Sequence, residues 1–226
     1  MDAFRHEGKG LLYLTVHPDG YRPEEDYPLV IMLHGFGAHM GDLAGLAPYL
    51  DRTGYVYACP NAPLAVQLGP GMAGFAWLPP RGTATPQDTE GAQTLLNSFF
   101  DEVMAQYRVP PGRAVLLGFS QGGGMTYRCG LERPDLFAGL VVLSGALPNE
   151  QEMQSHFPAQ RTQPIFLAHG LQDSMISVER ARLARALLER EGYHPRYQEY
   201  EMGHEISQEL LLDLASWMHE VLPPLR

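Results

Sequence analysis

Short β-rich apolar runs alternate with longer helical segments along this chain, and no other feature limits its possible folds as much. Several runs are continuously apolar rather than alternating, which is typical of strands covered on both faces. The pattern predicts an α/β fold: a mostly parallel, doubly wound sheet with helices on both faces. The expected strands span residues 11–17, 29–33, 55–59, 114–118, 139–143, 165–169 and 197–200.

Three segments between or after these strands have helical signals. Residues 85–107 begin with Thr-Pro and an acidic first turn, residues 177–191 stop at Gly192, and residues 205–221 repeat apolar residues at helical spacing. The strands before Pro28 are expected to pair in antiparallel fashion. A segment at residues 61–81, rich in Pro, Gly and apolar residues, has no clear period. We expect it to be a functional loop, because its hydrophobicity argues against disorder.

Length and charge limit the classes of protein to which the chain can belong. Its 226 residues, 45% of them hydrophobic, suit one compact domain over residues 1–226. The formal net charge of −10, with 16 scattered Lys and Arg, argues against a nucleic-acid partner. No apolar run approaches the roughly 20 residues that span a bilayer.

The N-terminal sequence and the cysteines bear on the compartment. The first residues do not have the pattern of a secretory signal, so we expect a cytoplasmic protein, although a removed signal stays an alternative. The two cysteines, Cys59 and Cys129, do not make a disulfide framework and are expected to be buried thiols.

A Gly-x-Ser-x-Gly pentapeptide is centred on Ser120 and supplies a candidate nucleophile. It follows the expected strand at 114–118 and opens a segment that can form a helix, which is the strand–turn–helix setting of a nucleophile elbow. The flanking Gly118 and Gly122 remove side chains that would clash with the neighbouring strand and helix. The alternative is a glycine-rich turn in which the serine only caps a helix.

Ser120 needs a base and an acid to become reactive, and the order expected in such a fold is serine, acid, histidine. Asp173 follows the expected strand at 165–169, and His204 follows the next expected strand, at 197–200. Loops at the carboxyl edge of a parallel sheet are where ligand sites assemble. We therefore predict Ser120, Asp173 and His204 as a catalytic triad. The alternatives are a helix-start role for Asp173 and a surface position for His204.

Other residues compete for these roles. His34 and His169 lie at strand ends before glycine, where a structural role in the turn fits at least as well. Two acidic residues close to His204 are alternatives to Asp173, but they are better placed to line the rim of a site; three further histidines have no strand-end context. These weaker candidates are Glu201, Glu205, His156, His194 and His219.

Acyl transfer also requires two N–H donors for the developing oxyanion. We expect the backbone N–H groups of Gln121, the residue after the serine, and of Phe36, between the glycines of the HGFG segment; an ordinary strand-to-helix loop is the alternative for that segment. Residues 64–78 are expected to form an apolar wall for an acyl group, lined by the substrate-binding candidates Phe75, Trp77 and Leu78, or else to be plain packing.

Seven ordered motifs, covering nearly the whole chain, resemble the acyl-protein thioesterase, phospholipase and carboxylesterase family of α/β-hydrolases. They are LHGFG, CPNAP, Trp77 in the apolar segment, GFSQGG, LSGALP, HGLQDSMISV and MGHEIS. The resemblance implies a single-domain esterase without a large cap, acting on short to medium acyl esters, lysophospholipids or acyl thioesters. Members often carry Asp where this chain has Ala38, and the LPPR that follows Trp77 is unusual; both departures concern substrate choice.

The function predicted is therefore hydrolysis of carboxylic esters through an acyl-enzyme intermediate, with a small-molecule ester as partner and neither metal nor organic cofactor. The chain has no CxxC, HExxH or phosphate-binding glycine loop. The oligomeric state, monomer or homodimer, stays open. Rival interpretations are a lysophospholipase, acyl-protein thioesterase, feruloyl or aryl esterase, polyester hydrolase or peptidase. From other classes, they are a hydrolase-fold protein that binds a small ligand without turnover, and a flavodoxin-like protein, which would not require Asp173 and His204.

Overall fold

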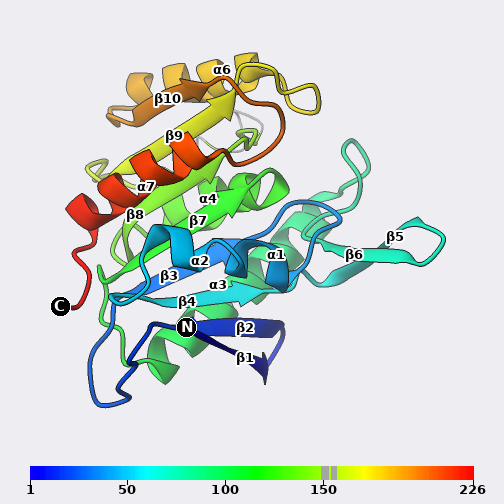
Figure 1. The fold of residues 1–226 in the computed structure, drawn as a ribbon. Helices are drawn as coiled ribbons and strands as arrows, with labels where there is room; N and C mark the ends of the chain where they lie inside the picture. The colour runs from blue at the N-terminus through cyan, green and yellow to red at the C-terminus, as the bar shows by residue number, and fades with distance from the viewer. Residues whose placement is uncertain (149–152, 154–156) are drawn as a thin grey trace.

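The computed structural model describes residues 1–148, 153 and 157–226 (Figure 1), so His156 lies outside the described residues. Its main sheet has eight strands in the order β1-β2-β4-β3-β7-β8-β9-β10. The six strands from β4 to β10 are parallel, and the β1–β2 hairpin joins their edge in antiparallel fashion. The strands are β1 (Asp2–Glu7), β2 (Leu12–His17), β3 (Leu29–Leu33), β4 (Val56–Pro60), β7 (Ala114–Phe119), β8 (Phe137–Leu143), β9 (Ile165–Gly170) and β10 (Arg196–Tyr200).

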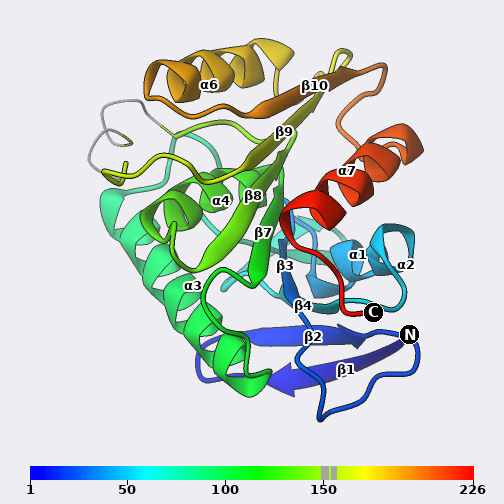
Figure 2. The ribbon, with the colours of Figure 1, turned by 90° about the vertical axis from the view of Figure 1, so that its left-hand side faces the viewer.

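Helices cover both faces of this sheet (Figure 2), which confirms the predicted fold class. One face carries α3 (Pro86–Gln106), α4 (Gln121–Glu132) and α6 (Val178–Arg190). The other carries α1 (Met40–Ala44), α2 (Ala47–Leu50) and α7 (Gln208–Val221).

Strand β3 shows why the central runs are continuously apolar. Leu29, Ile31 and Leu33 pack into the core beneath α3 and α4, whereas Val30 and Met32 pack into the opposite core. All five are at most 1% exposed. Fully burying such a side chain contributes roughly 1.5–3 kcal/mol, so both faces of the strand need apolar residues.

The long helices begin where their capping residues stand. Thr85 accepts a hydrogen bond from the Asp88 N–H while the Asp88 carboxylate accepts one from the Thr85 N–H, and Pro86 occupies the first turn. Ser177 and Ser207 cap α6 and α7 through their side chains alone, which accept hydrogen bonds from the N–H groups of Glu179 and Leu210. These caps place the ends of the loops that precede the helices, and the loop before α7 carries His204.

The prediction of a loop at residues 61–81 is wrong for much of this segment. Strands β5 (Leu64–Gly69) and β6 (Met72–Ala76) form an antiparallel hairpin that extends beyond the end of the main sheet (Figure 1). Its turn uses two glycines with positive φ, Gly69 and Gly71. The strands contain few β-branched residues and most of their side chains are exposed, so no apolar alternation marked them in the sequence.

Within the described part of the chain, no helix is long and apolar enough to cross a bilayer.

Candidate active site

The serine of the pentapeptide lies at the turn between β7 and α4. Ser120 has φ 56° and ψ −116°, a conformation rare for a residue with a side chain and worth on the order of 1–3 kcal/mol of strain. A Cβ on Gly118 would lie 2.2 Å from the Gly122 carbonyl oxygen, and one on Gly122 would lie 2.0 Å from the Leu33 carbonyl oxygen. Glycine at 118 lets α4 start close to β7, and glycine at 122 lets the start of α4 pack against the end of β3.

The three residues predicted as a triad are brought together by the loops after β7, β9 and β10. His204 Nε2 lies 2.9 Å from Ser120 Oγ, and His204 Nδ1 lies 2.7 Å from Asp173 Oδ2. The Asp173 side chain is fully buried, and the His204 side chain is 13% exposed. The imidazole therefore bridges a buried carboxylate and a hydroxyl that solvent can approach.

Asp173 is held as a carboxylate by its surroundings. Burial alone would raise its pKa, but hydrogen bonds from the Ile176 N–H and from His204 outweigh burial, and the pKa lies below its ordinary value. Its Oδ1 accepts the N–H groups of Met175 and Ile176 at 2.9 and 2.8 Å. This leaves Oδ2 for the imidazole, so one oxygen fixes the loop and the other orients His204.

His169 is the second histidine near the acid. Its Nε2 lies 2.7 Å from the Ile176 carbonyl oxygen and 3.2 Å from Asp173 Oδ2, and its side chain is fully buried. It therefore packs behind Asp173, consistent with a structural role.

His34 is also structural. Its Nδ1 lies 2.8 Å from the Gly35 carbonyl oxygen, and its Nε2 accepts the Ala62 N–H at 3.0 Å, an arrangement that requires a neutral ring. Burial lowers the pKa of His34, which agrees with that protonation state. The ring thus fixes the start of the loop after β3.

The remaining competitors lie in other contacts. Glu201 accepts a hydrogen bond from Gln172 at 3.0 Å, and His219 pairs with Asp51 at 2.9 Å. Neither Glu205 nor His194 belongs to the Ser120–His204–Asp173 chain of hydrogen bonds.

The two predicted oxyanion donors come from the start of α4 and from the loop after β3. The Gln121 N–H opens α4, where the first N–H groups of a helix have no intrahelical acceptor. The loop that carries Phe36 passes close by, since a Cβ on Gly35 would lie 3.2 Å from Ser120 Cβ. Among the described residues, neither the Phe36 nor the Gln121 N–H donates a hydrogen bond to another backbone group.

The candidates for the acyl wall lie at different depths. Phe75 and Leu78 are half-buried, but Trp77 is only 1% exposed. Its indole N–H donates to the His34 carbonyl oxygen at 2.8 Å, and its ring centroid is 5.3 Å from that of His34. Trp77 therefore packs beneath the loop after β3, and its contact with substrate stays a prediction.

Comparison with known proteins places the chain among relatives with this architecture. The family model for phospholipase/carboxylesterase matches residues 22–222. The chain belongs to the phospholipase/carboxylesterase family. This membership confirms the resemblance drawn from the motifs, and with it the prediction of a hydrolase of the carboxylesterase class.

Individual relatives agree with this membership. A probable carboxylesterase of Oryza sativa is 30% identical over 182 residues, covering 76% of this chain and 67% of the relative. Acyl-protein thioesterase 1 of Gibberella zeae is 30% identical over 177 residues, covering 73% and 75%. The crystal structure of esterase PE8 superposes with a TM-score of 0.80 at 25% identity, covering 92% of this chain and 97% of that one.

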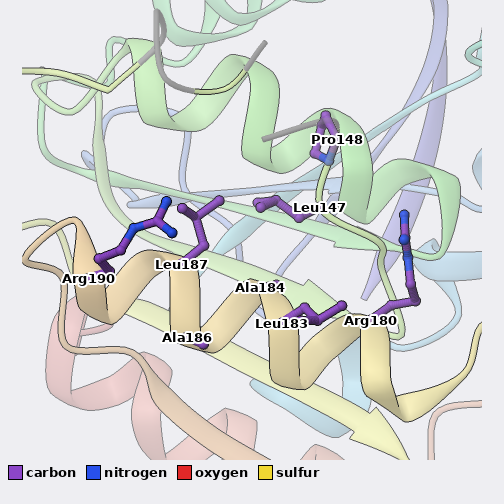
Figure 3. Close-up of a pocket in the computed structure, with 8 residues that line it drawn as sticks. All are labelled: Leu147, Pro148, Arg180, Leu183, Ala184, Ala186, Leu187 and Arg190. Carbon is purple, nitrogen blue, oxygen red and sulfur yellow. The ribbon is translucent and has the colours of Figure 1, made fainter. Parts of the chain in front are cut away.

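Several large apolar side chains of this phospholipase/carboxylesterase-family chain are exposed. They include Phe36 on the loop after β3, Leu68 and Met72 on the β5–β6 hairpin, and Leu171 and Met175, each two residues from Asp173. A separate groove along α6 contains none of the triad candidates (Figure 3). Its lining is Leu147, Pro148, Arg180, Leu183, Ala184, Ala186, Leu187 and Arg190.

Sequence reasoning missed the apolar side chains on the acid loop, because single exposed apolar residues are common on any surface. It also missed the contacts of the Gln121 side chain, whose amide binds residues 77 and 78 across a long sequence separation. The Gln in the pentapeptide was the only available signal, and it pointed to the backbone N–H.

Proposed function

We propose that the chain hydrolyses carboxylic esters with Ser120 as nucleophile, His204 as general base and Asp173 as the residue that orients the histidine. The observation that carries this proposal is the continuous set of contacts at 2.9 and 2.7 Å from Ser120 through His204 to Asp173. A nucleophile, a base within hydrogen-bond reach and an orienting third group are the requirements for this chemistry.

In the acylation step, Ser120 Oγ attacks the ester carbonyl carbon as His204 Nε2 takes the hydroxyl proton. The buried Asp173 carboxylate stabilises the imidazolium that forms. The N–H groups of Phe36 and Gln121 donate to the carbonyl oxygen as it gains negative charge, helped by the N-terminus of α4. His204 then gives its proton to the leaving alcohol oxygen, and the acyl group stays on Ser120.

Deacylation repeats these steps with water. His204 removes a proton from the water molecule, the hydroxide oxygen attacks the acyl carbon, and Ser120 leaves as the protonated hydroxyl. The products are a carboxylic acid and an alcohol, and none of these steps requires a metal or an organic cofactor.

The preferred substrate is an ester with a short to medium acyl chain. The exposed apolar side chains of Phe36, on the loop that contacts the Ser120 turn, and of Met175, two residues after Asp173, suit an acyl group better than a charged one. A thioester or lysophospholipid is the second candidate, because relatives of similar length are named acyl-protein thioesterase 1. An acyl thioester would pass through the same acyl-enzyme.

The test is hydrolysis of 4-nitrophenyl esters of increasing acyl length by wild type and by Ser120→Ala. We expect turnover that peaks on short or medium chains in wild type and is lost in the variant, with unchanged circular dichroism. A peak on long chains would move the substrate to lipids or acylated proteins. Turnover by Ser120→Ala equal to wild type would rule out the assigned nucleophile, and no turnover by wild type at any length would favour a binding protein.

A further inference from the structure

The two candidate oxyanion donors belong to separate elements, yet both elements bind the same segment, residues 62–78. On the loop after β3, Gly37 N–H donates to the Phe75 carbonyl oxygen and Phe75 N–H donates to the Ala38 carbonyl oxygen, both at 2.8 Å. Strand β6 thus pairs with the loop as a short antiparallel bridge. Further along, the Trp77 indole holds the His34 carbonyl oxygen, and the Ala62 N–H holds the His34 ring.

The bridge between β6 and the loop is unusually close. A Cβ on Gly74 would lie 1.8 Å from the Gly37 carbonyl oxygen and 2.4 Å from its carbonyl carbon. Leu68, on the other strand of the hairpin, packs over Gly37, whose φ is +79°. The hairpin therefore encloses the residue next to Phe36 and limits the directions in which the Phe36 N–H can point.

The side chain of Gln121 completes the connection. Its Oε1 accepts the Trp77 N–H at 2.8 Å, and its Nε2 donates to the Leu78 carbonyl oxygen at 2.9 Å. The backbone N–H of Gln121 is thus one candidate oxyanion donor, and its side-chain amide hydrogen-bonds the segment that contacts the loop of the other donor, Phe36. An amide suits this position because it supplies one acceptor and one donor at the same reach.

From these contacts the geometry points to a positioning role for the Gln121 side chain: it couples the start of α4 to residues 77–78, so that the N–H groups of Phe36 and Gln121 converge on one oxygen. This inference rests on the proposed function, because it assumes that these N–H groups bind an oxyanion. Donors fixed beforehand need no reorganisation when charge develops, which is the source of their effect on rate. Removing the side-chain hydrogen bonds of Gln121 should therefore reduce kcat more than substrate affinity.

The experiment compares Gln121→Met and Gln121→Glu with wild type. Met keeps the length and removes both hydrogen bonds, whereas Glu keeps an acceptor for the Trp77 N–H but places a carboxylate oxygen against the Leu78 carbonyl. We expect kcat to fall about tenfold to hundredfold, less than the ~10²–10³ of losing a donor outright, with Glu at least as impaired as Met. We expect KM to stay within about threefold, as for an interaction made mainly in the transition state.

The matched control is Gln93→Met on α3, which also removes a side-chain hydrogen bond between elements, from Gln93 Nε2 to Glu132 at 2.7 Å. It should leave kcat and KM unchanged. Affinity for a trifluoromethyl ketone, which forms a hemiketal oxyanion on the serine, should fall in the Gln121 variants by about the same factor as kcat. The pH profile of kcat/KM should keep its shape, because the Ser120–His204–Asp173 contacts are not altered.

Two kinds of failure can be told apart with a fluorophosphonate label for reactive serines. If wild type is not labelled, the proposed function fails. If wild type is labelled and Ser120→Ala is not, but Gln121→Met keeps wild-type kcat and ketone affinity, the positioning role alone is overturned. It is likewise overturned if the loss lies only in KM, or if Gln93→Met loses as much kcat. Thermal unfolding of each variant identifies any that do not fold, and Gln121→Glu then serves in place of Gln121→Met.

Discussion

Replacing Gly122 with alanine tests how tightly the serine turn must pack against β3. The new Cβ would lie 2.0 Å from the Leu33 carbonyl oxygen, 2.6 Å from the Leu33 carbonyl carbon and 2.7 Å from the His34 carbonyl oxygen. All three are backbone atoms, so no side chain can rotate away. The start of α4 must shift until these contacts exceed 3.0 Å, the distance below which real Cβ contacts are essentially not seen.

The energetic cost of Gly122→Ala follows from two opposing effects. Alanine in a helix gains roughly 0.5–1 kcal/mol over glycine, whereas forcing atoms into a packed core costs typically about 1–3 kcal/mol, sometimes more. We expect a net loss of about 1–2 kcal/mol of unfolding free energy. A shift of about 1 Å at the Gln121 N–H should also lower kcat by up to ~10²-fold.

A matched control lies two residues away on the same helix. A Cβ on Gly124 would meet only the Ala146 carbonyl oxygen, at 3.5 Å, which is ordinary contact. Gly124→Ala should therefore leave kcat unchanged and stabilise the protein by up to about 1 kcal/mol. Urea unfolding and ester hydrolysis would be measured for both variants. Equal stability and activity in the two variants would refute the reasoning that close backbone atoms are what makes glycine necessary at position 122.

Three further predictions address other parts of the chain. Asp173→Asn should lower kcat by about 10³–10⁴-fold while the protein stays folded, because the imidazole loses the carboxylate that sets its tautomer; ester hydrolysis measures this, and a loss below tenfold would contradict the role. Gly91→Ala, within α3 where a Cβ would meet nothing within 4 Å, should stabilise the protein by roughly 0.5–1 kcal/mol in urea unfolding without changing kcat; destabilisation would contradict the open space seen there. The unfolding free energy should fall as pH drops below about 6.5, because burial lowers the pKa of His34 in the folded state and the unfolded state then binds more protons. Urea midpoints between pH 7.5 and 5 would be less sensitive to pH in His34→Asn, and an equal pH dependence in both proteins would exclude His34 as a source.

The parts of the fold that could be predicted from the sequence are those in which burial or capping requires particular residue types. Strand β3 is a continuous apolar run because both of its faces are covered. The start of α3 is indicated by Thr85 and Pro86, which are typical of a helix N-terminus. Asp173 and His204 were predictable as neighbours because each follows a strand of the parallel sheet, and such strands end at the same edge.

The parts that could not be predicted are held in place mainly by backbone hydrogen bonds and close backbone contacts. The antiparallel pair expected before Pro28 is the β1–β2 hairpin, but the bounds of β1 (Asp2–Glu7) were not predicted. This strand pairs only with β2 and is almost wholly exposed, so its residues need not be apolar. The β5–β6 hairpin pairs with the loop at Gly37 and Ala38, and what matters there is the missing side chain of Gly74. A glycine in a sequence does not tell which distant backbone atom comes close to it.

The same distinction explains why the candidate reacting groups could be proposed from the sequence, whereas the contacts that hold them in place could not. A serine, an acid and a histidine are required by the chemistry itself, so their types and order can be sought along the chain. The contacts proposed to orient the candidate oxyanion donors join Gln121 to residues 77 and 78 and the Trp77 indole to His34, and such contacts need only a donor and an acceptor that the fold brings together. Many residue types could serve, so their identity follows from the structure and must be tested by substitutions such as Gln121→Met.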